Sequence, residues 1–243
     1  MKKIKIFSLL FFTTLLFNSC EEDISAPGTP YASFESYLTN VIVKQGQETK
    51  KSIKVYTANV IGQDRTIGLA ITTNLDPNAF VAPTSVIIPA NSNVGTVDLT
   101  FKDVNLDLLV DKSFKYSIVQ TAEILAGSSR TIMIARGCGT GTKKLNVTVK
   151  FDDYPEEVYW RIRNSLGETV LASKIPAGYG GYAAGTKGSK SHAACITPGS
   201  YTFRVLDQYK DGAGAIAVTL DGKSIYSSAG AYGAGASQVF TVD

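Results

Sequence analysis

Alternation of apolar and polar residues is the feature that most restricts how this chain can fold. Every second residue is apolar from Leu145 to Phe151, and the same period of two recurs around Trp160, Phe203 and Val218. Successive side chains of a β-strand point to opposite faces, so this period predicts strands with one buried and one solvated face. Long helical periodicity is absent, and the chain has 22 glycines. The sequence therefore predicts an all-β fold.

Two blocks of such strands lie on either side of a glycine-rich segment at residues 137–142. The first block, residues 31–136, contains alternating runs such as Val97-Asp-Leu-Thr-Phe101, with turn residues between them. About seven short strands at this spacing favour a sandwich of immunoglobulin type. The second block covers residues 143–243, and the length of the chain suits two domains. We therefore expect two β-sandwich domains in tandem, joined by a hinge.

The N-terminal segment has the pattern of an export signal. Lysines precede an apolar run over residues 6–17, which is too short to cross a bilayer as a helix. Ser19-Cys20 then resembles the lipobox of bacterial lipoproteins, which implies that residues 1–19 are removed and that Cys20 is acylated. Several acyl chains on one cysteine anchor a protein stably. The alternatives are an ordinary signal peptide with an incidental cysteine and an uncleaved anchor.

Three acids follow the cysteine, at Glu21, Glu22 and Asp23. They resemble the surface-export signal of lipoproteins of the Bacteroidota, which implies an outer-membrane protein that faces the cell exterior. The other interpretation is a solvated tether over residues 20–30. Three lysines in the predicted signal peptide account for the formal net charge of +3, so the rest of the chain is close to neutral. A neutral chain argues against a nucleic-acid partner.

Two cysteines, Cys138 and Cys195, are left once Cys20 is assigned to lipid. In an oxidising compartment such a pair favours a disulfide. The bond would close a long loop and contribute about 4 kcal/mol of stability in the chain-entropy model. The alternative is two unpaired thiols.

The first block resembles a known domain type. Residues 80–101 have a strand, a proline, a small polar turn and a second strand, which resembles Calx-beta domains. Residues 31–135 are also similar to immunoglobulin-like N-terminal domains of Bacteroidota surface lipoproteins from glycan-uptake loci. The acids Asp103, Asp107 and Asp111 lie on a leucine-rich stretch, so we assign no metal to this domain.

The second block is similar to an accessory β domain of secreted and surface proteins. Three motifs carry the resemblance: Asp153-Tyr-Pro-Glu-Glu157 before Trp160, Cys195-x-x-x-Gly-x-Tyr-x-Phe203, and Asp207-x-Tyr-x-Asp-Gly212. That family has no established catalysis, which implies a binding or accessory role. Relatives often carry further cysteines where this chain has Ser200 and the stretch 211–215, which implies that Cys195 is free to pair with Cys138.

A calcium site is one interpretation of the last motif. Asp207 and Asp211 are candidate ligands, and backbone carbonyls with Asp152, Asp153, Glu156 or Glu157 could supply further oxygens. Calcium binds about six to eight oxygens, and the spacing does not match an EF-hand loop. In the other interpretation, the two aspartates accept backbone N–H groups of a tight turn.

Aromatic residues are the other candidates for a binding site. Tyr179 and Tyr182 lie among glycines in a loop without periodicity, and Tyr209 lies between the two aspartates. We expect these tyrosines to bind a ligand, whereas Trp160 alternates with apolar residues and is assigned to the core. His192 is the only histidine, so a zinc site has almost no ligands.

The expected function follows from these features. No Gly-x-Ser-x-Gly elbow is present, and we expect no enzyme. We expect a non-catalytic, lipid-anchored protein of the outer membrane that binds a glycan or a protein partner, for example as an accessory subunit of an outer-membrane complex. The alternative is a structural or adhesion protein in which both domains are spacers.

Overall fold

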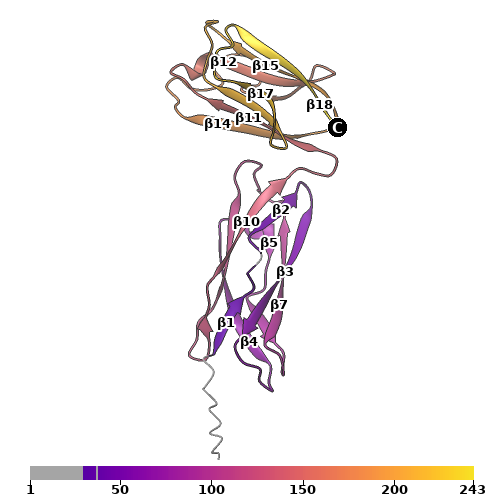
Figure 1. Ribbon diagram of the computed structural model, residues 1–243, viewed down its shortest axis with the longest axis vertical. Helices are drawn as coiled ribbons and strands as arrows, with labels where there is room; N and C mark the ends of the chain where they lie inside the picture. Colours follow the sequence, from indigo (N-terminus) through magenta and orange to yellow (C-terminus); the bar gives the residue numbers. More distant parts are fainter. Residues whose placement is uncertain (1–29, 37) are drawn as a thin grey trace, which may run out of the picture.

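The computed structural model describes residues 30–36 and 38–243 (Figure 1). The predicted signal peptide, the lipidation site Cys20 and almost all of the predicted tether lie outside the described residues. The described chain forms four β-sheets and two short 3-10 helices, η1 (Pro77–Ala79) and η2 (Pro155–Glu157). No helix in this part of the chain is long and apolar enough to span a membrane. The predicted all-β fold is confirmed.

The first sandwich contains two five-stranded sheets. In the order of their pairing, one sheet consists of β5 (Phe80–Val81), β7 (Val94–Lys102), β3 (Glu48–Thr57), β1 (Tyr31–Phe34) and β9 (Leu125–Ala126). The other consists of β2 (Asn40–Lys44), β10 (Arg130–Gly137), β8 (Lys112–Ile118), β4 (Arg65–Thr73) and β6 (Ser85–Ile88).

The chain changes sheets between β1 and β2. β1 pairs antiparallel with β3 in the first sheet and parallel with β9, whereas β2 pairs parallel with β10 in the second sheet. The β2–β10 register runs from Asn40 opposite Met133 to Lys44 opposite Gly137. β2 therefore forms an edge of the second sheet, whereas β1 lies inside the first sheet between β3 and β9.

Apolar side chains between these two sheets form the first core. Its centre is Phe114, whose ring lies 5.3 Å from that of Phe101 and 5.5 Å from that of Tyr116 in edge-on contacts. All three side chains are buried. Such aromatic pairs add about 0.5–1.5 kcal/mol each beyond the area that they bury. The alternation seen in the sequence thus places its apolar half in this core.

The second sandwich contains two four-stranded sheets. One sheet, in the order of its pairing, consists of β14 (Ser189–Ile196), β11 (Lys143–Lys150), β16 (Ile216–Leu220) and β17 (Lys223–Ser228). The other consists of β13 (Thr169–Ala172), β12 (Val158–Asn164), β15 (Gly199–Asp207) and β18 (Gly235–Val242). Trp160 and Phe203 are fully buried between these sheets, as the alternation predicts.

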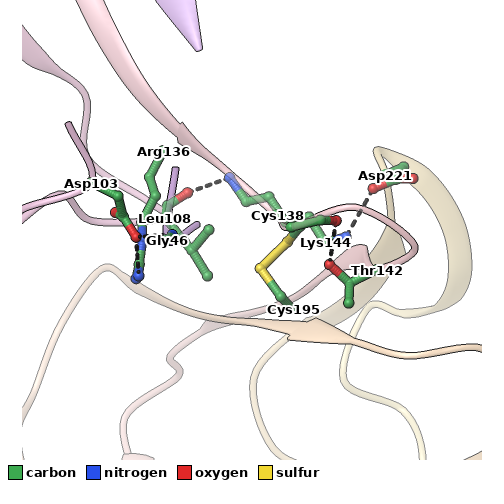
Figure 2. The surroundings of a disulfide bond; sticks show 10 residues. Gly46, Asp103, Leu108, Arg136, Cys138, Thr142, Lys144, Cys195 and Asp221 are labelled. Atoms are coloured by element: carbon green, nitrogen blue, oxygen red, sulfur yellow. Dashed lines mark hydrogen bonds and ion pairs between the residues drawn. A yellow bond between two sulfur atoms is a disulfide. The ribbon is translucent and has the colours of Figure 1, made fainter. Parts of the chain in front are cut away.

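The two sandwiches meet at residues 138–142, which connect β10 to β11 (Figure 2). The structure contains the disulfide that we predicted between Cys138, directly after β10, and Cys195 of β14. Lys144 of β11 reaches back to the first sandwich, where its Nζ donates to the carbonyl oxygen of Leu108. Its backbone N–H donates to Asp221 Oδ1 at 2.9 Å. Covalent and polar contacts therefore hold the predicted hinge.

An ion pair fixes the adjacent end of the first sandwich (Figure 2). Oδ1 of Asp103 lies 2.7 Å from Nε of Arg136, and Oδ2 accepts hydrogen bonds from Nη2 of Arg136 at 2.9 Å and from the backbone N–H of Gly46 at 2.8 Å. Burial acts to raise the pKa of Asp103, but the hydrogen bonds from Arg136 and Gly46 outweigh burial and hold the pKa below its ordinary value. Asp103 therefore joins the β2–β3 turn to β10.

Candidate functional site

The loop that follows β15 is organised by Asp207. This carboxylate is buried, and it accepts the backbone N–H groups of Tyr209 at 3.4 Å, Asp211 at 2.9 Å and Gly212 at 2.8 Å. A carboxylate that receives several backbone N–H groups stabilises a tight turn. Asp207 thus has the contacts expected from the turn interpretation of the Asp-x-Tyr-x-Asp-Gly motif.

Three carboxylates meet beside this loop. Glu157, Asp207 and Asp211 each have an oxygen atom within 4.8 Å of the other two. The sequence correctly brings Asp207 and Asp211 together. Of the four acids that we expected to supply further oxygens, Glu157 joins them and the other three do not. Asp153 is exposed and forms an ion pair with Lys187 at 2.5 Å, and Glu156 is outside the group. Glu157 is the last residue of η2 and directly precedes β12.

The donor set fits a cation only in part. Calcium takes about six to eight oxygens, and three carboxylates supply the negative charge that it requires. Asp207, however, already uses its oxygens for backbone N–H groups, so Glu157 and Asp211 would provide most of the free side-chain oxygens. Calcium therefore stays a prediction for this loop.

Replacing Glu157 by glutamine is expected to raise the melting temperature at pH 7 in a chelator. Partial burial, together with the charges of Asp207 and Asp211, raises the pKa of Glu157 above its ordinary value of 4.5. The folded protein then binds this proton more tightly than the unfolded chain, so stability falls as pH rises from 4.5 through the raised pKa. The advantage of E157Q should be fully present above that pKa and shrink as pH falls toward 4.5.

The same melts test the calcium prediction. Calcium held by the three carboxylates would raise the melting temperature of the wild type above its value in chelator, and E157Q would lose this rise. Equal melting in calcium and in chelator would contradict the predicted site. For the pH effect, the contradicting result is an E157Q variant that melts below the wild type at pH 7 in chelator.

The three tyrosines that we predicted as ligand-binding residues differ in how far they are buried. Tyr182 is buried in the second core, so its assignment as a binding residue is wrong. Tyr179 is half-buried and its ring lies 6.3 Å from that of Tyr159. Tyr209 is 67% exposed in the loop that follows β15 and stays a candidate.

Tyr182 is held in the core by a polar network. Its hydroxyl accepts the indole N–H of Trp160 at 2.8 Å and lies 3.1 Å from Nε2 of His192. Its ring packs edge-on against Phe151, with centroids 4.6 Å apart. Burial raises the pKa of Tyr182 to about 12, and burial with the nearby charge of Lys190 lowers the pKa of His192. Both groups are therefore neutral at pH 7.

A groove of about 650 Å³ lies on the outer face of the sheet β13-β12-β15-β18. Its volume falls in the range of about 300–1,000 Å³ that is typical of ligand sites. β12 supplies Arg161 and Arg163, β15 supplies Thr202 and Arg204, and the start of β18 supplies small residues around Gly235. Arginine, hydroxyl and backbone groups can all bond a polar ligand there.

Sequence reasoning missed this groove, although part of its signal is visible. Alternation places Trp160 and Phe203 inside, so the residues that follow them, Arg161 and Arg204, must point outward. What the sequence does not show is the pairing that brings the two arginines to the same place on the sheet. The sequence instead predicted ligand-binding tyrosines in the loop at residues 178–190.

Comparisons with known proteins give distant likenesses only. No family model matches the chain, and no curated protein matches it. Of the solved structures, an auxiliary nutrient binding protein from Bacteroides thetaiotaomicron is 9% identical, with 85% of this chain and 91% of that chain covered and a TM-score of 0.34. A multidomain protein including DUF1735 from Bacteroides ovatus is 12% identical over 78% of this chain and 71% of its own, with a TM-score of 0.37.

A Calx-beta structure is also similar to this chain. CBD12 from CALX1.2 is 12% identical, with 78% of this chain and 81% of that chain covered and a TM-score of 0.37. These TM-scores and identities are too low for any argument about function, which must come from the chain's own residues.

Proposed function

We propose that this chain is a non-catalytic binding protein of the outer membrane that binds a glycan on its second sandwich. In this proposal a lipid on Cys20 anchors the chain, and the acids after Cys20 direct it to the cell exterior. The first sandwich then carries the second one away from the membrane. A protein partner is the alternative ligand for the same surface.

The groove on the outer face of β13-β12-β15-β18 is the observation that carries this proposal. It is open to solvent and polar, and the hydroxyls of Ser165 and Thr202 lie along it. Sugars are recognised through many hydroxyl groups, which such donors and acceptors suit. Protein interfaces instead have an apolar, aromatic centre, and this groove has none.

The junction gives a specific reason to keep a spacer role as the second candidate. The disulfide Cys138–Cys195 and the bond from Lys144 to Leu108 hold the connection between the two sandwiches. A protein that only separates a partner from the membrane needs such a stiff connection. A spacer, however, has no use for the groove, and this difference makes the two roles separable.

Tryptophan at Thr202 is expected to abolish glycan binding because the ring would fill the groove from the middle of β15. The matched control is T96W, which adds the same side chain to an exposed threonine of β7 in the first sandwich. Purified wild type and variants are tested on a panel of neutral and acidic polysaccharides. The proposal fails if the wild type binds none of them, or if T202W binds as the wild type does.

A further inference from the structure

Arginines are concentrated on the outer face of the sheet β13-β12-β15-β18. Arg161 of β12 is directly opposite Arg204 of β15, and Arg163 is opposite Thr202. Directly opposed residues of an antiparallel pair have Cβ atoms about 5 Å apart, and like charges at this position destabilise the sheet. The fold therefore holds two cations side by side where uncharged residues would be more stable.

No carboxylate neutralises these arginines within residues 30–36 and 38–243. The ion pairs of that part of the chain involve Arg136 and lysines, and none involves Arg161, Arg163 or Arg204. Arg161 lies over the ring of Tyr159, with Cζ 5.9 Å from the centroid. Nε of Arg163 is buried without a hydrogen-bond partner. A ligand with negative charge would therefore supply the counter-charge that the described residues do not give these guanidinium groups.

The shape of the groove shows how such an acceptor could reach the arginines. The three arginines share it with two small residues, Gly235 at the start of β18 and Ala234 directly before it. A Cβ atom on Gly235 would lie only 2.5 Å from the carbonyl oxygen of Val205. The backbone here therefore requires glycine, and no side chain fills this side of the groove. An extended chain can therefore lie along the sheet with its charged groups against the guanidinium groups.

We propose that this groove binds an acidic polysaccharide through the carboxylates of its uronic acid units. This inference rests on the proposed function and names its ligand class. The guanidinium fork matches a carboxylate in two parallel hydrogen bonds, and arginine suits this role better than lysine does. A carboxylate between Arg161 and Arg204 would replace their repulsion with attraction, and the next unit along the chain would reach Arg163.

The test is calorimetric titration of the purified protein with polygalacturonate in a buffer that contains chelator. The chelator prevents calcium from bridging the polymer to the carboxylates of Glu157 and Asp211. The double variant R161Q/R204Q is expected to bind about tenfold more weakly or worse, because both charge-assisted bonds are lost. R161K/R204K should recover only part of the affinity, since lysine keeps the charge but lacks the fork.

A matched control variant, K51Q/K54Q, removes two exposed positive charges from β3 of the first sandwich and should bind as the wild type does. R161Q/R204Q removes a like-charge pair, so its melting temperature should be no lower than that of the wild type. Weaker binding by this variant then results from the lost contacts in the groove and not from unfolding. The fully methyl-esterified polymer has the same backbone without the charge and should not bind detectably.

Several results would overturn the inference. One is equal binding of the charged and the esterified polymers, and another is unchanged affinity of R161Q/R204Q. Preference for dextran sulfate would point to sulfate groups, and preference for polyglutamate would point to an acidic protein. If neutral glycans bind and polygalacturonate does not, this inference falls while the proposed function stands. If no glycan binds, both fall.

Discussion

Alanine in place of Tyr182 is expected to destabilise the second sandwich by about 3–5 kcal/mol, the usual cost of truncating a large buried aromatic residue. The substitution would leave a cavity beside Phe151 and remove the acceptor of the Trp160 indole N–H. Trp160 is the only tryptophan of the chain and is buried in this core, so its fluorescence during urea unfolding reports the second sandwich alone.

Phenylalanine at the same position separates packing from hydrogen bonding. Tyr182→Phe keeps the ring but leaves the indole N–H of Trp160 without its acceptor, and an unsatisfied buried donor costs about 1–3 kcal/mol. We therefore expect Y182F to lie between the wild type and Y182A. Most surface substitutions change the free energy of unfolding by less than about 0.5 kcal/mol. A change this small for Y182A would contradict the burial of Tyr182.

Removal of the disulfide is the second large effect. Cys138 and Cys195 are 57 residues apart, and β11, β12, β13 and most of β14 lie between them. Cross-linking a loop of this length contributes about 4 kcal/mol in the chain-entropy model. The variant C138S/C195S should therefore unfold earlier when followed by Trp160 fluorescence, and the transition of the first sandwich should move little in a calorimetric scan.

Reduction of the wild type provides the matching control. Dithiothreitol should lower the second transition of the wild type toward that of C138S/C195S and should leave the variant unchanged. If the variant instead lowered the first transition as strongly as the second, the stability that the disulfide supplies would not be concentrated in the second sandwich. That result would contradict the assignment.

Strands could be predicted from the sequence because their signal is local. The period of two around Trp160 and Phe203 decides which side chains are buried whatever lies beyond the strand, and the structure buries both residues. Tyr182 could not be predicted in this way. Its neighbours are glycines and alanines without a period, and its burial depends on partners from β12 and β14 that only the folded chain brings together.

The candidate site depended on the same kind of distant pairing. Asp207 and Asp211 are close in sequence, so the motif alone brought them together. Glu157 joins them because Val158 pairs with Asp207 across β12 and β15, and the same register sets Arg161 against Arg204. A register is fixed by whole strands and by the turns between them. It is therefore a property of the sheet, which residue spacing cannot reveal.

The parallel pairing of β2 with β10 has a mechanical consequence. Suppose that a force pulls on the chain before β2 and on the chain after β10. Because the two strands are parallel, the force draws them in opposite directions along their length, and all five residue pairs from Asn40–Met133 to Lys44–Gly137 bear the load together. An antiparallel hairpin pulled at its open end would separate one pair at a time. The first sandwich is therefore built to withstand tension between the beginning of the chain and a ligand held by the second sandwich.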